Sequence, residues 1–190
     1  LTNFNLLIKP KTKVALVGRT GSGKSTIASL IYRFYEPTKG QILFDDKDYL
    51  DLPQSFIRNS IGFILQDALL FDDTILNNIK YGKQDASLEE VKDVCQKIGL
   101  DEFIENMKDG YDTRVGEGGL LLSNGQKQLL AFARVLLKNP DIIILDEATS
   151  SIDSKTEQLI QNCINTQFKD KTCIFIAHRL STIKDVDNII

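Results

Sequence analysis

The feature that most constrains the fold is a glycine-rich segment between a predicted strand and a predicted helix. Val14-Ala15-Leu16-Val17 is a short apolar run typical of a strand, and helical spacing follows from about Gly23 to Tyr35. Between them, Gly18-Arg19-Thr20-Gly21-Ser22-Gly23-Lys24-Ser25 fits the pattern G-x-x-x-x-G-K-[ST]. This order of strand, loop and helix predicts a phosphate-binding loop, or P-loop.

The residue types of this loop suit a phosphate group. Glycines lack Cβ atoms, so successive backbone N–H groups can turn inward around phosphate oxygens, and the following helix points its positive end at the same place. Lys24 adds a full positive charge, the Ser25 hydroxyl is a candidate Mg²⁺ ligand, and Thr26 can donate to phosphate. The alternative is a glycine-serine turn with an incidental lysine, which the flanking strand and helix disfavour. The candidate phosphate-binding residues are Gly18, Arg19, Thr20, Gly21, Ser22, Gly23, Lys24, Ser25 and Thr26.

The rest of the chain alternates short apolar runs with helical patterns. Strands are expected at 41–44, 61–65, 142–145 and 172–176, and helices at 74–81, 87–98, 101–107, 123–138, 154–168 and 180–184. Such alternation predicts an α/β fold, a P-loop NTPase with a mostly parallel sheet core flanked by helices. The strand-poor middle predicts an inserted α-helical subdomain over about 67–138, with the catalytic core over about 1–66 and 139–190.

Composition excludes several classes of protein. The chain has 190 residues, a net charge of −3, 42% hydrophobic and 26% charged residues, which argues against a disordered chain and a strongly basic nucleic-acid binder. We therefore expect no nucleic-acid partner. No apolar run approaches the roughly 18 residues that span a bilayer. The start, Leu1-Thr2-Asn3-Phe4, lacks Met and does not resemble a signal peptide, so the chain is expected to be a segment of a longer one.

Cysteine and histidine usage limits metal chemistry. Cys95, Cys163 and Cys173 are odd in number and lack metal-ligand spacing, so they are interpreted as reduced cysteines of a cytosolic protein. His178 is the one histidine, which excludes a site built from several histidines.

An acidic pair follows the apolar run at 142–145. The carboxyl ends of parallel strands face the ligand crevice, so Asp146 is expected beside the P-loop, where it would hold Mg²⁺ through its water shell. Glu147 points elsewhere and is placed to polarise an attacking water. The alternative, a solvated acidic turn, is less favoured once a P-loop lies upstream.

A family resemblance rests on six motifs in order. Leu122-Ser123-Asn124-Gly125-Gln126 resembles the leucine-serine-glycine-glycine-glutamine signature of ATP-binding cassette (ABC) ATPases. The other elements are the P-loop at 18–26, Gln66 of the Q-loop, Asp146-Glu147, the D-loop at 151–153 and His178. The segments at 70–79 and 113–117 are similar to those of exporter cassettes rather than importer cassettes.

The resemblance implies roles for these residues. Ser123, Gly125 and Gln126 at a helix N-terminus would serve the γ-phosphate bound by a second cassette, in a head-to-tail dimer that encloses two ATP molecules. Gln66 would reach Mg²⁺ or the water and report the nucleotide state. His178 would contact the γ-phosphate, and Asp153 would join the two sites while also capping its own helix. Lys24, Gln66, Glu147 and His178 are the implied catalytic residues, and Ser25, Gln66 and Asp146 the implied metal ligands.

The sequence departs from the family pattern at three places. Asn124 replaces a glycine of the signature, and asparagine was expected to keep the turn because it tolerates left-handed backbone. Gly118 stands where exporter cassettes often carry arginine. The aromatic that stacks on adenine is expected upstream of the P-loop, and Phe4 is too near the P-loop to be assigned that role.

The resemblance implies ATP hydrolysis that powers transmembrane export of an unidentified substrate. Transmembrane domains, expected to be fused upstream, would place the chain at the cytoplasmic face of the cell membrane, with an identical or different second cassette as partner. Two alternatives stay open: a soluble ABC ATPase of DNA repair or translation, and a regulatory cassette that binds ATP without hydrolysing it.

Overall fold

The computed structural model describes residues 3–146, 152–176 and 185–190. The chain divides into two compact units. The sheet unit takes the described residues of 1–63, 140–147 and 171–190, and the helical unit takes those of 64–139 and 148–170. Each unit is described by itself below.

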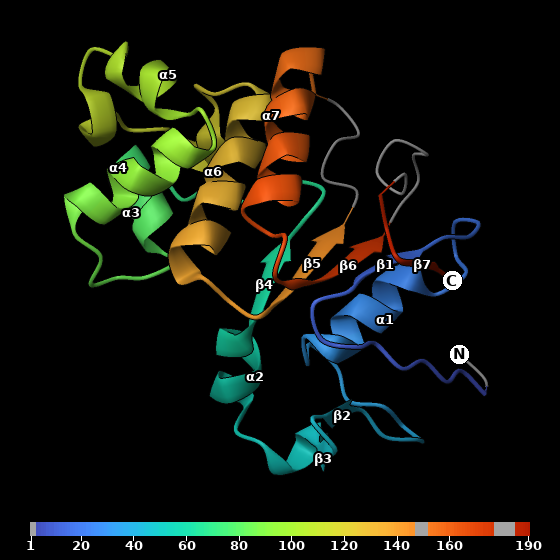
Figure 1. The fold of residues 1–190 in the computed structure, drawn as a ribbon. Helices are drawn as coiled ribbons and strands as arrows, with labels where there is room; N and C mark the ends of the chain where they lie inside the picture. The colour runs from blue at the N-terminus through green and yellow to red at the C-terminus, as the bar shows by residue number, and fades with distance from the viewer. Residues whose placement is uncertain (1–2, 147–151, 177–184) are drawn as a thin grey trace. The chain divides into compact units, whose positions relative to one another are not determined.

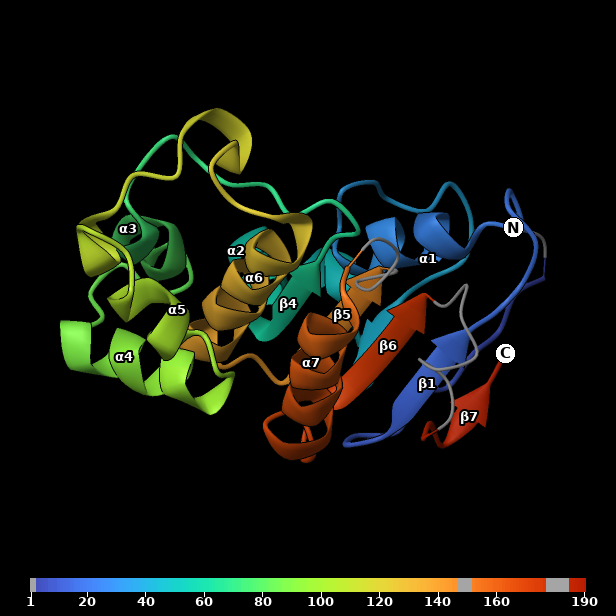
Figure 2. The same cartoon turned by 90° about the horizontal axis from the view of Figure 1, so that it is seen from above.

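A five-stranded sheet forms the frame of the sheet unit, with strand order β4-β5-β6-β1-β7 (Figure 2). Three neighbouring pairs, β5 with β6, β6 with β1 and β1 with β7, are parallel. The strand bounds are Lys13–Leu16 (β1), Ile61–Ile64 (β4), Ile142–Asp146 (β5), Thr172–Ile176 (β6) and Asn188–Ile189 (β7). The predicted α/β fold with a parallel sheet is therefore confirmed.

Helix α1 (Lys24–Ile31) packs on this sheet through Ala28, which is fully buried. The buried core of the unit also contains side chains from the strands and from helix α2 (Gln54–Ser60). Its other members are Leu16, Tyr49, Ile57, Ile61, Ile144, Ile174 and Ile176. Since the helix and strands share one apolar core, the loop between β1 and α1 is anchored at both ends.

The region between α1 and β4 differs from the prediction. Helix α1 ends at Ile31 rather than near residue 35, because Arg33 takes a left-handed conformation (φ 58°) that a helix cannot continue. The expected strand at 41–44 shrinks to β2 (Leu43–Phe44). It pairs with β3 (Lys47–Asp48) in a separate antiparallel hairpin, turned by Asp45 and Asp46 at positive φ. A short 3₁₀ turn, η1 (Tyr49–Asp51), follows. Helix α2 was not predicted.

The helical unit contains the remaining helices (Figure 1). Their bounds are Ile75–Lys80 (α3), Leu88–Lys97 (α4), Asp101–Glu105 (α5), Asn124–Lys138 (α6) and Ser154–Thr166 (α7), with 3₁₀ turns at Gly110–Asp112 (η2) and Glu117–Gly119 (η3). Each α-helix lies within two residues of its predicted bounds. Side-chain caps at Thr74, Ser87, Ser123 and Asp153 explain where four of them begin.

Helix α6 is the centre of this unit. It packs against α3, α4 and α7, and α6 and α7 run side by side in both views (Figures 1 and 2). Phe132 of α6 is fully buried and stacks on Phe168, with ring centroids 5.9 Å apart. The helix ends where Asn139 turns left-handed (φ 53°) before Pro140, as the sequence predicted.

The two compact units differ from the predicted subdomains in where they place α7. The sequence assigned α7 to the catalytic core, whereas compactness groups it with α6 in the helical unit. The functional division therefore stays a prediction, with a catalytic core over about 1–66 and 139–190 and a helical subdomain over about 67–138. The helix expected at 180–184 lies outside the described residues.

Two further expectations concern membrane-spanning segments and cysteines. Within the described ranges, no helix combines the length and the apolarity needed to cross a bilayer. Cys95, Cys163 and Cys173 all lie in those ranges, are buried and form no disulfide. Burial raises the pKa of Cys95 to about 11 and that of Cys173 to about 12, so both are protonated thiols at neutral pH.

Candidate functional site

The P-loop has the backbone that the sequence predicted. Gly21 (φ 84°) and Gly23 (φ 99°) both take left-handed conformations that disfavour any side chain, and Gly23 caps the N-terminus of α1. At Gly18, a Cβ atom would come within 2.9 Å of the Ser22 hydroxyl oxygen. The glycines thus permit a tight turn at the positive end of α1.

Lys24 bends back over this turn. Its side chain is only 7% exposed, and its Nζ donates to the carbonyl oxygens of Gly18 (2.8 Å) and Arg19 (3.2 Å). A buried ammonium needs such partners, because removing it from water is costly. The loop therefore holds a full positive charge, while Ser25 and Thr26 lie exposed on the first turn of α1.

Strand register sets Asp146 relative to this loop. Asp146, the last residue of β5, pairs with Ile176 of β6, which in turn pairs with Leu16 of β1. Neighbouring strands lie about 4.8 Å apart, so the Asp146 backbone lies about 10 Å across the sheet from the strand end that leads into the P-loop. Both groups thus meet the carboxyl edge of one parallel sheet, where ligands of such sheets bind.

The residues at this edge fit a magnesium nucleotide. The Ser25 hydroxyl and the Asp146 carboxylate are the hard oxygen ligands that Mg²⁺ prefers. The glycine turn leaves its backbone open, with no heavy atom within 4 Å of a Cβ built on Gly21. Glu147 and His178 lie outside the described residues, so their predicted roles stay predictions.

The signature segment forms the N-terminus of α6, as predicted. Ser123 is the N-cap: its Oγ accepts from the Gln126 N–H (3.2 Å), and the Gln126 Oε1 accepts from the Ser123 N–H (2.8 Å). This capping box holds both side chains at the helix end. The turn is kept with Asn124 in place, as expected, but tolerance of left-handed backbone is not the reason. Ser123 itself is extended (ψ 160°), so Asn124 is already the first residue of a right-handed helix.

Gly125 is the point where the N-terminal ends of α6 and α7 meet. A Cβ atom there would lie 2.9 Å from Thr156 Oγ1 and 3.2 Å from Asp153 Oδ2. Asp153 caps α7 by accepting from the Thr156 N–H (3.0 Å) and the Thr156 hydroxyl (2.7 Å), and these bonds hold the pKa of its carboxyl below the ordinary value. The signature and the D-loop are therefore packed together within the helical unit.

Gln66 follows β4 by two residues, and its side chain is exposed. Its carbonyl oxygen accepts from the side-chain amide of Gln128 in α6. Sequence reasoning missed Gln128, although a glutamine among the apolar residues of that helix was a usable signal. The structure thus brings Gln66 and the signature helix together within one unit.

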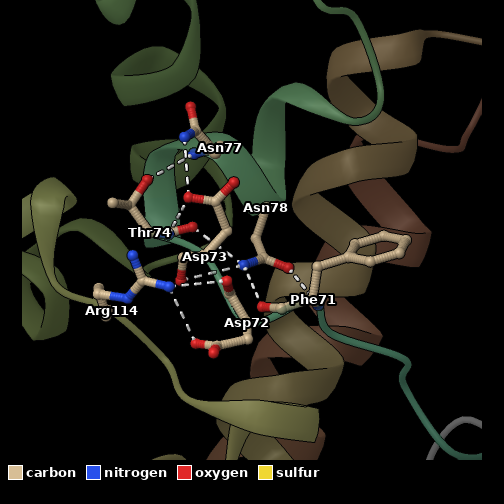
Figure 3. Close-up of polar contacts among 7 residues, drawn as sticks. All are labelled: Phe71, Asp72, Asp73, Thr74, Asn77, Asn78 and Arg114. Carbon is tan, nitrogen blue, oxygen red and sulfur yellow. Dashed lines mark hydrogen bonds and ion pairs between the residues drawn. The ribbon is translucent and has the colours of Figure 1, made fainter.

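The two exporter-like segments also lie side by side (Figure 3). The Ile75 N–H donates to Thr113 O (2.9 Å), and the Val115 N–H donates to Asp73 O (3.0 Å). Arg114 Nη2 donates to the carbonyl (3.0 Å) and the carboxylate (3.3 Å) of Asp72. Two segments about forty residues apart in the sequence thus form one structure.

Asn78 organises the first of these segments. It is fully buried, and its side chain accepts from the Phe71 N–H and donates to Phe71 O and Thr74 O, each at 3.0 Å (Figure 3). Arg134 of α6 donates to the Asn78 side-chain oxygen (2.6 Å) and lies 5.7 Å from the centroid of the Phe71 ring. Burial lowers the pKa of Arg134 to about 10, so it is still charged at neutral pH. Sequence reasoning missed both residues.

Comparison with known proteins agrees with this geometry. The family described as ABC transporter matches residues 1–150. The chain belongs to the ABC transporter family. It is 47% identical over all of its 190 residues to an ATP-dependent lipid A-core flippase of Chromobacterium violaceum. It is also 47% identical to a multidrug export ATP-binding/permease protein of Bacillus subtilis.

A solved structure described as a bacterial Atm1-family ABC exporter with ATP bound superposes with a TM-score of 0.91. The two chains are 46% identical, and the match covers 96% of this chain and 32% of that one. The chain spans about a third of the two curated relatives as well. Family and fold are thereby shown: the chain has the α/β fold of an ABC exporter ATP-binding domain.

Asn78→Ala should lower the free energy of unfolding by about 2–4 kcal/mol, because it removes the acceptor of the Phe71 N–H and of the Arg134 guanidinium at a fully buried position. Chemical denaturation of the full-length protein measures the change. Asn77→Ala is the matched control: its exposed side chain donates to Asp73 Oδ1, so about 1 kcal/mol or less is expected. Equal losses in both variants would contradict the role of Asn78.

Gly125→Ala should lower the free energy of unfolding by about 1–3 kcal/mol through overpacking against Thr156. Alanine normally stabilises a helix relative to glycine by about 1 kcal/mol, so the sign is diagnostic. Thr156→Ala removes the atoms in the way, and the double variant should recover part of the loss relative to additivity. A stabilised Gly125→Ala variant would show that the two helix ends are not in close contact.

Proposed function

We propose that this chain binds ATP and hydrolyses it to ADP and phosphate as the nucleotide-binding domain of an ABC exporter. In this role it powers transmembrane export of an unidentified substrate. The observation that carries the proposal is the P-loop, in which left-handed Gly21 and Gly23 frame the buried ammonium of Lys24. The printed descriptions of the relatives, a flippase, an export permease and an exporter with ATP bound, support the same activity.

The residues divide the work of phosphoryl transfer. Inward N–H groups of the loop bind phosphate oxygens, and Lys24 exchanges its bonds to Gly18 and Arg19 for bonds to the β- and γ-phosphates. Ser25, Gln66 and Asp146 would hold Mg²⁺, which would compensate the negative charge of the phosphates. Glu147 polarises the attacking water, and His178 steadies the γ-phosphate and that water. Arg19, Thr20, Ser22 and Thr26 complete the phosphate contacts.

The partner is a second nucleotide-binding domain arranged head to tail. The N-terminal end of α6, with Ser123, Gly125 and Gln126, then faces the γ-phosphate bound by the other copy, where the positive end of a fifteen-residue helix favours an anion. Asp153 joins the two sites. Closure of this dimer on ATP moves transmembrane domains from an inward-facing to an outward-facing state, and release of phosphate reopens it.

The membrane domains are fused upstream, and the chain lies at the cytoplasmic face of the cell membrane. Two observations support this arrangement. One relative is described as an ATP-binding/permease protein, and the chain accounts for only 33% of its length. The two segments that are similar to exporter cassettes, 70–79 and 113–117, are also joined by backbone hydrogen bonds. Their contact in the structure supports the exporter resemblance independently of their sequences.

Lys24→Ala should weaken ATP binding at least about tenfold, because the loop loses its charge-assisted bonds to phosphate. Titration of a fluorescent ATP analogue into the full-length protein measures the affinity. Lys39→Ala changes an exposed lysine outside the loop and should bind like the parent. An unchanged affinity in Lys24→Ala would remove the P-loop assignment.

Glu147→Gln should abolish phosphate release while ATP binding is kept, because glutamine has the same size but cannot act as a base. The ATP-bound dimer should then accumulate, which size-exclusion chromatography of the full-length protein with ATP detects. Glu102→Gln, on the exposed side of α5, is the control and should turn over like the parent. Turnover at the parent rate in Glu147→Gln would contradict the assigned role.

A further inference from the structure

Gln128 is a buried amide on the signature helix. It lies in α6, only 4% exposed, and is followed by the buried apolar residues Leu129 and Leu130. Buried glutamines are uncommon, because an amide without partners loses its bonds to water. A buried amide at this position is therefore expected to have specific hydrogen-bond partners.

The amide holds the Q-loop backbone. Its Nε2 donates to the Leu65 carbonyl oxygen (3.1 Å) and to the Gln66 carbonyl oxygen, more than sixty residues away in the sequence. Two carbonyl acceptors fix the orientation of the amide, because the flipped group would place oxygen against oxygen. Both donor hydrogens are thus used on two consecutive peptide groups of one segment.

The other end of the amide is left unsatisfied. The Oε1 of Gln128 is buried and, within the part of the chain that the structure describes, has no hydrogen-bond donor. Leaving a buried acceptor unpaired costs about 1–3 kcal/mol, which offsets much of the gain from the two donated bonds. Stability alone therefore gives little reason for a glutamine here.

Helix α6 connects this contact to the signature residue Ser123. Ser123 and Gln128 belong to one capped helix, and Gln128 lies about 7.5 Å along the axis from Ser123 at 1.5 Å per residue. A helix of this length moves as a rigid body, so the backbone of Gln66 is registered to the signature end of α6. The Gln66 side chain stays exposed while its own carbonyl is held.

We propose that Gln128 is a positioning residue that ties Gln66 to the signature helix, so that the Q-loop and Ser123 move together. The inference rests on the proposed function, since it assumes that Gln66 reaches Mg²⁺ or the attacking water. Without the tie, ATP still binds at the P-loop, but Gln66 is presented in more than one place. The chemical step then slows while the affinity for ATP is kept.

Gln128→Leu tests the tie, because leucine fills similar space without a donor. In the full-length protein, kcat for ATP hydrolysis should fall at least about tenfold, with KM for ATP within about twofold of the parent. Hydrogen exchange of the amides at 65–68, measured without nucleotide, should become faster. Gln161→Leu is the matched control, a half-buried glutamine of α7 outside both contacts, and should leave kcat and this exchange unchanged.

Gln128→Glu separates positioning from packing. A neutral carboxyl donates one hydrogen bond to the Q-loop, whereas the ionised form has no donor and faces two carbonyl oxygens. Burial and these oxygens both raise the pKa of the new carboxyl. Its kcat relative to the parent should therefore rise as pH falls from about 8 to about 6, while the ratio for Gln128→Leu stays flat.

Each outcome decides a different statement. Unchanged exchange at 65–68 in Gln128→Leu overturns the tie itself. If exchange in Gln128→Leu is faster but kcat equals the parent value, the tie has no part in turnover. If Gln161→Leu loses as much kcat as Gln128→Leu, the loss reflects the packing of α6 and α7 rather than the tie. A parent without ATPase activity contradicts the proposed function instead, and the exchange data then decide the tie alone.

Discussion

The register of three parallel strands is the constraint on which the candidate site depends. Leu16, Ile176 and Asp146 lie level across β1, β6 and β5, so the loop that follows β1 and the carboxylate that ends β5 share one edge. Hydrogen bonds between the strands fix this register, and a slip of one residue would move Asp146 out of line with Ile176 and Leu16. The chemistry of the site thus inherits its spacing from the packing of the core.

Helix α6 has the corresponding role in the helical unit. Four separate contacts start from it: the Ser123 cap, the close approach at Gly125, the amide of Gln128 and the guanidinium of Arg134. The Ser123 cap holds the helix end itself, whereas the other three contacts reach Asp153 of the D-loop, the Q-loop and the exporter-like segment at 70–79. Because these contacts belong to one helix, a displacement of its N-terminus would also displace the D-loop, the Q-loop and the segment at 70–79.

Local patterns predicted much of this structure. The bounds of β6 were predicted to the residue, and the capped helices α3, α4, α6 and α7 were found because their N-caps precede clear apolar periodicity. The P-loop could be predicted because its glycines are needed for backbone conformations that few other residues adopt. Helix α2 and the hairpin of β2 and β3 were missed because they are short and depend on tertiary packing.

The missed site residues share a different cause. Gln128 and Arg134 bond to backbone groups more than sixty residues away, and Asn78 bonds to backbone groups of the preceding loop. No periodicity of the sequence records such bonds. Asn124 has a local explanation: the extended residue is Ser123, so Asn124 starts the helix, and the capping geometry shows this. The sequence suggests candidates for the reacting groups, whereas the structure shows the buried polar groups that hold the neighbouring segments. Gln66 joins both kinds, since its exposed side chain is proposed to serve the nucleotide while its carbonyl oxygen accepts from Gln128 of α6. Under the proposed coupling, a displacement of Gln66 is transmitted to the signature helix through the carbonyl group that Gln128 holds.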